Sequence, residues 1–191
     1  MKNKIMTGWN SKVVPNLTRR NFLGVGAAAA VLTVAPSALA ATPKPVRELT
    51  LVNLHTDERT TAPYWEGGDF ESDALVALNS VLRDHRTGDV YDMDARLYDA
   101  LTHLNQTLGG GHTFHIISGY RSPASNAALR KNSSGVAKKS FHMRGMAVDV
   151  RVPTIDLNRL HRAAKSLKMG GVGKYAKSNF IHFDVGPVRY W

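Results

Sequence analysis

The chain has 191 residues, a formal net charge of +10 and no cysteine. This length suits one domain with a tail and is too short for two large domains. The absence of cysteine excludes a disulfide framework, a thiolate metal site and a thiol nucleophile, so any bound metal has to be held by histidine and carboxylate side chains.

The positive charge is unevenly distributed. Residues 1–40 contain 5 basic side chains and no acidic one, and residues 41–120 contain 6 basic and 12 acidic side chains. Residues 121–191 contain 14 basic side chains against 3 acidic ones. This cationic half favours an anionic polymer as partner, either a nucleic acid or a cell-wall glycan, although a solvated basic face has the same composition.

Residues 1–40 have the pattern of an export signal. A basic stretch is followed by the apolar run Phe22–Val34 and by Ala38-Leu39-Ala40, which matches a small-x-small cleavage site. Because the run is shorter than the ~20 residues of a membrane-spanning helix, we expect no stable membrane anchor after cleavage. The pair Arg19-Arg20 resembles the twin-arginine motif, which predicts a twin-arginine-type signal peptide over 1–40 and a periplasmic domain over 41–191.

The remainder of the chain has the pattern of short strands and helices. Alternating apolar residues predict a hairpin from Arg47–Leu54 and Arg59–Tyr64. Leucines at helical spacing predict a helix capped by Ser72, and a second helix that Asp94 starts and Gly109-Gly110-Gly111 ends. We further expect a strand over Thr113–Ser118, a helix over Ser125–Lys131, a basic loop over Asn132–Lys139, a strand over Met146–Val152, a helix over Asp156–Lys168 that Gly170-Gly171 ends, and a strand over Phe180–Val185. Without regular β-α-β alternation, the pattern predicts an α+β fold with a small, mainly antiparallel sheet flanked by helices.

Two segments contain side chains suited to metal binding. His142 precedes the strand over Met146–Val152 and Asp149 lies within it, so both can reach one ion if the chain folds back at Gly145. His182 lies in the last strand between apolar neighbours. Such a histidine is more often a core residue, but two histidines and one aspartate form a complete ligand set for a catalytic zinc with one open position.

Together these segments resemble the zinc peptidases that include lysostaphin, D-Ala-D-Ala carboxypeptidases and the amino-terminal signalling domain of hedgehog. The resemblance rests on Ser118-Gly-Tyr-Arg-Ser122, on the pattern Ser140-x-His142-x-x-Gly145-x-Ala147-x-Asp149 and on the strand histidine that follows. Residues 46–191 are most similar to the YcbK-like (MepK-type) murein endopeptidases, also in Gly135-Val-Ala137, Gly171-Val-Gly173 and the segment Val185–Trp191.

The resemblance implies a hedgehog/D-Ala-D-Ala-peptidase-like fold and a zinc-dependent murein endopeptidase, a metallopeptidase that hydrolyses peptide cross-links of peptidoglycan in cell-wall remodelling. It implies that one Zn²⁺ ion is bound by His142, Asp149 and His182, with water in the fourth position. Arg121 matches the family arginine that precedes the motif, and its guanidinium suits a substrate carboxylate or the developing oxyanion. Arg144 and Arg151 are weaker alternatives for this role.

Two assignments remain open at this level. Ser140 either hydrogen-bonds the substrate or caps its own loop. The relatives place a glutamate three residues, or a histidine two residues, before the last ligand, where this chain has Asn179 and Phe180. Asp184 is the best candidate for the general base, or else it accepts the free N–H of His182 and fixes that ring. His112 and His115, expected near the same strand end as Arg121, are minor alternatives.

The same features allow a function of another class, an exported zinc-stabilised module that binds the cell wall without hydrolysis. The missing glutamate favours it, and so does the hedgehog relative, which signals by binding. Nucleic-acid binding is disfavoured, because the basic residues lack interleaved aromatic residues and an exported protein seldom meets nucleic acid. The expected partners are therefore peptidoglycan stem peptides, and the sequence sets neither the oligomeric state nor the bond that is cut.

Overall fold

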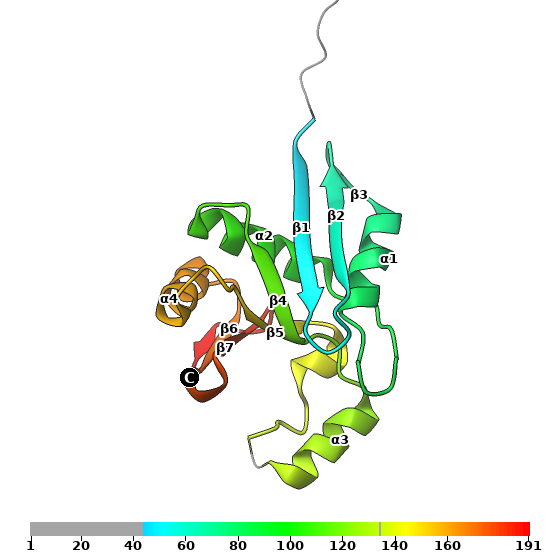
Figure 1. Cartoon of the computed structure of the whole chain (residues 1–191), viewed down its shortest axis with the longest axis vertical. Helices are drawn as coiled ribbons and strands as arrows, with labels where there is room; N and C mark the ends of the chain where they lie inside the picture. The colour runs from blue at the N-terminus through cyan, green and yellow to red at the C-terminus, as the bar shows by residue number, and fades with distance from the viewer. Residues whose placement is uncertain (1–43, 134) are drawn as a thin grey trace, which may run out of the picture. The chain divides into compact units, whose positions relative to one another are not determined.

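The computed structural model describes residues 44–133 and 135–191. The predicted signal peptide over 1–40 lies outside the described residues. Within them the chain forms one eight-stranded mixed sheet in the order β3-β2-β1-β4-β5-β7-β6-β8 (Figure 1). The strands are β1 (Val46–Asn53), β2 (Arg59–Glu66), β3 (Asp69–Phe70), β4 (Thr113–Ser118), β5 (Ala147–Arg151), β6 (Gly171–Tyr175), β7 (Phe180–Asp184) and β8 (Arg189–Tyr190). The helices are α1 (Ser72–Val81), α2 (Ala95–Leu108), α3 (Pro123–Asn132) and α4 (Leu157–Leu167), with the short 3-10 helices η1 (Phe141–Arg144) and η2 (Ala176–Ser178).

The strand pairing is mainly antiparallel. β1 and β2 form the predicted hairpin, and only the β1–β4 and β6–β8 pairs of the described sheet are parallel. The predicted α+β class with a mainly antiparallel sheet is thereby confirmed. The sheet is larger than expected, since β3, β6 and β8 were not predicted. β3 and β8 have two residues each, too few for an alternating pattern, and β6 contains two glycines, which have low strand propensity.

One face of the sheet forms the core. Phe114 and Ile116 of β4 and Val148 and Val150 of β5 are at most 1% exposed. They pack with buried residues of α1, α2 and α4 in a single hydrophobic cluster. Because side chains alternate along a strand, the residues between them, including Asp149, point to the opposite face. The predicted site residues of the central strands therefore lie on the face away from these helices.

Local chemistry explains most helix ends. Asp94 caps α2 by accepting a hydrogen bond from a backbone N–H, and Gly109 ends the helix with a φ of 113°, both as predicted. The prediction that Ser72 caps α1 is wrong, because Glu71 occupies the N-cap position and makes no side-chain cap bond. The prediction that glycines end α4 is also wrong. α4 ends at Leu167, its C-cap is Lys168 with a φ of 53°, and Gly171 already belongs to β6.

α3 lies beyond the end of β4, at the bottom of Figure 1. It begins two residues earlier than predicted, at Pro123, because Ser122 accepts a hydrogen bond from the Ser125 N–H and proline fits the first helical turn. In the described part of the chain, no helix combines the length and the apolar character needed to cross a membrane.

Candidate metal centre

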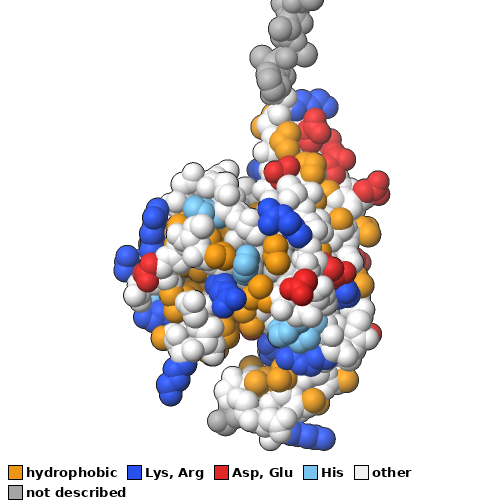
Figure 2. All heavy atoms as spheres, in the orientation of Figure 1, with side chains coloured by type: hydrophobic (Ala, Val, Ile, Leu, Met, Phe, Trp, Pro, Cys, Tyr) orange, Lys and Arg blue, Asp and Glu red, His pale blue; other side chains and the backbone are white. Residues whose placement is uncertain are grey.

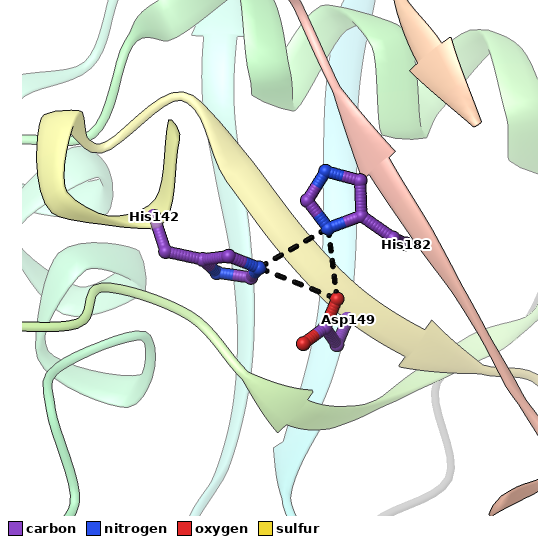
Figure 3. Close-up of side chains that lie close together, drawn as sticks. All are labelled: His142, Asp149 and His182. Atoms are coloured by element: carbon purple, nitrogen blue, oxygen red, sulfur yellow. Dashed lines mark hydrogen bonds and ion pairs between the residues drawn. The ribbon is translucent and has the colours of Figure 1, made fainter. Parts of the chain in front are cut away.

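Three side chains expected to bind metal meet on the sheet face away from the core helices. His142 belongs to η1, Asp149 to β5 and His182 to β7 (Figure 3). His142 Nε2 lies 3.2 Å from His182 Nδ1 and 3.3 Å from Asp149 Oδ1, and this oxygen lies 3.0 Å from His182 Nδ1. All three residues are buried. One donor atom of each residue therefore faces a common point.

The backbone brings these residues together in two ways. Asp149 and His182 are directly opposite each other on the antiparallel strands β5 and β7. His142 reaches them because Gly145 ends η1 with a φ of 64° and returns the chain into β5. A Cβ atom at Gly145 would lie 2.9 Å from the Asp92 carbonyl oxygen, so the position also requires a residue without a side chain. The predicted fold-back at Gly145 is confirmed.

The outer nitrogen of each imidazole is held by an acceptor. His142 Nδ1 lies 2.8 Å from the Gly119 carbonyl oxygen, and His182 Nε2 lies 2.8 Å from Asp184 Oδ2. A carbonyl oxygen only accepts, so we assign the His142 proton to Nδ1, and the Asp184 carboxylate likewise assigns the His182 proton to Nε2. In the neutral form that metal ligation requires, each ring would direct a lone pair toward the common point.

Asp184 lies on the far side of the His182 ring from the other two donors. Its Oδ1 accepts hydrogen bonds from the backbone N–H groups of Gly171 and Gly186, and the Arg189 guanidinium reaches Oδ1 at 3.1 Å and Oδ2 at 2.6 Å. Burial raises the pKa of Asp184, but hydrogen bonds from His182, Arg189 and the two backbone groups outweigh burial and lower it to about 2. Both carboxylate oxygens thus have partners, in an arrangement suited to orienting His182.

Arg189 and Trp191, near this carboxylate and the His182 ring, were given no individual role from the sequence, although their segment contributes to the family resemblance. Arg189 of β8 and Trp191, which follows it, lie beside β6. A Cβ atom on Gly171 would lie 2.5 Å from Arg189 Nη1, and one on Gly173 would lie 2.4 Å from Trp191 Cε2. The Trp191 ring lies 5.3 Å from the His182 ring, centroid to centroid. Two glycines spaced two residues apart were the available signal, because they open space on one face of a strand.

Arg121 lies beside the three donors. Its Nη2 is 3.3 Å from Ser118 Oγ and 3.5 Å from Asp149 Oδ2. Its Nε is buried without a hydrogen-bond partner among the described residues. Burial lowers the pKa of Arg121, which nevertheless stays far above neutrality, as for any arginine in a protein. A charged guanidinium with an unused buried donor is suited to bind an acceptor group.

The donors lie in a cavity of about 780 Å³. Residues of α3 and of the segment that follows it form one side, and Figure 2 shows a notch between the surface over α3, at the bottom, and the rest of the surface. Ser140 also lines the cavity, where its hydroxyl accepts a hydrogen bond from the His142 N–H at 3.4 Å and caps η1. Among the described lining residues, Asp149 is the one carboxylate, whereas Arg86, Arg121, Lys139 and Arg189 are cationic.

The minor alternatives lie away from the three donors. His112 precedes β4 and Arg121 follows the other end of this strand, which spans about 20 Å, so the expectation that they share a strand end is wrong. His115 is in the first half of β4 and lines a different cavity together with Arg151. Arg144 is exposed and stacks over a phenylalanine ring.

The donor set fits a metal ion. Ligand atoms at the usual ~2.0–2.1 Å from a tetrahedral zinc are about 3.3 Å apart, and the three atoms here are separated by 3.0 to 3.3 Å. Burial raises the pKa of Asp149, but the neighbouring His142 and His182 outweigh burial and hold it well below its usual range, so the carboxylate is ionised. One carboxylate and two imidazoles, with room in the cavity for a fourth ligand, form a donor set that suits a catalytic metal ion.

Comparison with known proteins places the chain within a family. The family model described as peptidoglycan L,D-endopeptidase MepK matches residues 40–191. Peptidoglycan L,D-endopeptidase MepK of Escherichia coli (strain K12) is 43% identical over 176 residues, which cover 91% of this chain and 96% of the relative. The probable peptidoglycan L,D-endopeptidase MepK of Haemophilus influenzae is 39% identical over 177 residues, 91% of this chain and 95% of the relative. No solved structure gives a significant match. The chain belongs to the MepK family of peptidoglycan L,D-endopeptidases.

Proposed function

We propose that this protein is a zinc metallopeptidase that hydrolyses peptide cross-links of peptidoglycan in cell-wall remodelling. The observation that carries the proposal is the convergence of His142 Nε2, His182 Nδ1 and Asp149 Oδ1, with both imidazoles held in the ligating tautomer. Family membership supports the reaction, because the relatives are named for L,D-endopeptidase activity on peptidoglycan. The α+β fold with a central site is consistent with a hedgehog/D-Ala-D-Ala-peptidase-like architecture.

One Zn²⁺ ion would be held by His142, Asp149 and His182. The mixed imidazole and carboxylate set favours zinc over magnesium or calcium, which prefer oxygen ligands. When bound, zinc supplies Lewis acidity for the attack of water on a peptide carbonyl. The chain itself contributes a rigid, buried donor set, since two of the ligands come from paired strands and the third is fixed by the turn at Gly145.

Arg121 is proposed to bind the substrate and to stabilise the negative charge that develops on the attacked carbonyl. Its buried, unpartnered Nε supports this role, because a substrate oxygen would satisfy a donor that has no partner in the described protein. Its contact with Asp149 Oδ2 keeps the guanidinium next to the reacting centre. Ser140 is proposed to place His142 through its cap of η1, with its hydroxyl proton available to the substrate.

For Asp184 we propose a positioning role. The alternative role, general base, requires a carboxylate that faces the attacking water. Both oxygens of Asp184 are instead hydrogen-bonded to His182, Arg189 and backbone N–H groups. A pKa of about 2 also makes it a weak base at neutral pH. It would hold the His182 ring in the orientation and tautomer that ligation needs.

We further propose that residues 1–40 direct export by the twin-arginine pathway and that the domain over 41–191 acts in the periplasm. The twin arginines, the apolar run and the Ala38-Leu39-Ala40 site support this proposal. The partners would be peptidoglycan stem peptides, not nucleic acid. The cationic side chains of the cavity suit an acidic polymer.

Mass analysis of muropeptides before and after incubation with the zinc-loaded protein tests the reaction. We expect cross-linked species to disappear and products heavier by one water in total to appear. His142→Ala should lower the rate by at least about a hundredfold, because loss of a direct ligand exceeds the 10–100-fold effect of residues that only orient ligands. His103→Ala, which removes an exposed histidine of α2, is the matched control.

The same variants separate hydrolysis from binding alone. An enzyme can retain cell-wall binding in His142→Ala while turnover is lost, whereas a zinc-stabilised binding module would lose wall binding. Zinc-loaded protein that leaves every cross-linked muropeptide intact, while a MepK relative cleaves them, would refute the proposed reaction.

A further inference from the structure

A second cavity lies at the carboxyl end of β5, the strand that carries Asp149. We call it the β5-end pocket. It has a volume of about 290 Å³, polar lining from His115, Arg151 and Asn179, and apolar lining that includes Val152, Ile155 and Leu160. This volume is near the lower limit of ~300–1,000 Å³ for ligand pockets, so the pocket suits one small group of a larger ligand.

The strand register places this pocket relative to the metal ligands. β5 continues beyond Asp149 in Figure 3, and Arg151 lies two residues further along it, on the same strand face. His115 of β4 is directly opposite Arg151. Two residues of a strand span about 7 Å, which is also the reach of two residues of an extended peptide. A peptide bound at the metal centre and parallel to β5 would therefore reach the β5-end pocket with a residue about two positions away.

The polar groups of the pocket can donate hydrogen bonds and lack acidic partners. His115 Nδ1 is buried and has no hydrogen-bond partner among the described residues. None of the ion pairs in residues 44–133 and 135–191 includes Arg151. No carboxylate of the described residues lines the pocket. Burial lowers the pKa of His115, and the charges of Arg151 and Arg59 lower it further, so the ring is neutral and the local field is positive.

We propose that the β5-end pocket binds a carboxylate of the substrate peptide about two residues from the scissile bond. The identity of the ligand rests on the proposed function. Arg151 would supply the charge and His115 Nδ1–H a hydrogen bond, which would satisfy the buried nitrogen. The apolar lining would accommodate the short aliphatic part of the residue that bears the carboxylate. Together with Arg121 at the centre, the pocket would select stem peptides with free acid groups.

The test compares Arg151→Gln with Arg162→Gln, which removes an equal charge from an exposed position of α4. Two substrates are used, a purified cross-linked muropeptide and the same muropeptide with its carboxyl groups converted to amides. We expect Arg151→Gln to raise KM for the acid about tenfold, to change kcat less than twofold and to leave KM for the amide unchanged. Arg162→Gln should change neither value. A shift in KM that is equal for acid and amide, or no shift at all, overturns the proposal.

Two further measurements keep the outcome decisive. If Arg151→Gln fails to fold by circular dichroism, Arg151→Lys and His115→Phe replace it, and each should raise KM for the acid about threefold or more without affecting the amide. Equilibrium binding of both muropeptides to the metal-free protein is measured by calorimetry. If the wild type binds the acid but cleaves nothing, the proposed function fails, and a tenfold weaker affinity in Arg151→Gln still supports the carboxylate site. If Arg151→Gln binds the acid as tightly as the wild type does, the proposed carboxylate site is refuted. The proposed hydrolysis is then judged separately, from cleavage by the wild type.

Discussion

Replacement of Arg189 by alanine tests whether the contacts behind His182 tune the metal centre. Arg189 makes hydrogen bonds of 2.6 and 3.1 Å to the two oxygens of Asp184, which in turn holds His182 Nε2 at 2.8 Å. In Arg189→Ala the buried carboxylate keeps its two backbone donors and loses its positive partner. The His182 ring then has a less firmly fixed acceptor, although every direct ligand is unchanged.

The expected effects follow from these contacts. Partners that orient metal ligands contribute about 10–100-fold to metal affinity, and we expect about tenfold here because Asp184 itself remains. The free energy of unfolding should fall by about 1–2 kcal/mol, since hydrogen bonds to charged groups contribute ~1.5–3 kcal/mol and solvent screens part of this contribution. The Arg189 side chain is 39% exposed, which is the reason for that reduction.

The pH dependence of stability gives a second test of the contact between Arg189 and Asp184. The pKa of Asp184 is lowered in the folded protein, so its contribution to stability is present above the unfolded value and is lost as the pH falls through the folded value of about 2. Without Arg189 the folded pKa of Asp184 rises toward the unfolded value, so the loss of stability on acidification should be smaller and should end at a higher pH.

Zinc affinity is measured by competition with a chromophoric chelator at pH 7, and unfolding by urea titration. Arg189→Lys retains the charge but not the two-point contact, and should lie between wild type and Arg189→Ala. Arg162→Gln controls for the loss of one positive charge. Zinc affinity within twofold of wild type in a destabilised Arg189→Ala would show that Arg189 is structural only and would refute the reasoning.

Three further predictions concern packing, pH and metal. Gly173→Ala places a Cβ atom 2.4 Å from Trp191 Cε2. We therefore expect the free energy of unfolding in urea to fall by about 1–3 kcal/mol, and cleavage to slow because the indole shifts against His182. Gly135→Ala is the control and should change little, because the nearest neighbour of its Cβ atom is 3.7 Å away. Burial raises the pKa of Asp84, but hydrogen bonds from Ser125, Ser122 and Arg86 outweigh burial and lower the pKa to about 2. The ionised carboxylate therefore contributes fully to the stability of the fold above pH ~4, and this contribution is lost as the pH falls toward 2. Asp84→Asn should accordingly flatten the stability profile between pH 4 and 2, by about 2 kcal/mol, and an unchanged profile would contradict this account. Removal of metal with a chelator should abolish cleavage and lower the Tm, and added zinc should restore both, because ion binding stabilises the folded state; a Tm indifferent to chelation would contradict the proposed centre.

Local chemistry explains which parts of the site were predictable. His142, Gly145 and Asp149 lie within eight residues of one another, and the need for a residue without a side chain at the turn is visible in the sequence. The structure confirms the fold-back and adds its cause, which is the close approach of the Asp92 carbonyl oxygen to Gly145. The capping of α2 by Asp94 was predictable for the same reason, since a cap involves only neighbouring residues.

Whether the Asp184 carboxylate faces the attacking water or the outer nitrogen of His182 was not predictable. Alternation along β7 indicates that it shares a strand face with His182, but not which nitrogen of the ring it contacts. That contact depends on Gly186 and Arg189, which follow Asp184 and turn back onto its carboxylate, and on Gly171 of β6, which lies 13 residues away. His112 likewise could be placed only once the direction of β4 in the sheet was known.

The sequence by itself determined the α+β class, the absence of thiol chemistry and the short-range spacing that lets His142 and Asp149 approach one another, whereas His182 was joined to them by the family resemblance. The tertiary structure decided the tautomers of His142 and His182, the hydrogen bond from the Gly171 N–H to Asp184 and the formation of the β5-end pocket between strand and helix residues. These features arise where β4, β5, β6, β7 and β8 meet, strands separated by up to about seventy residues in the sequence. Pairing between such distant segments is set by packing of the whole sheet, which no local pattern records.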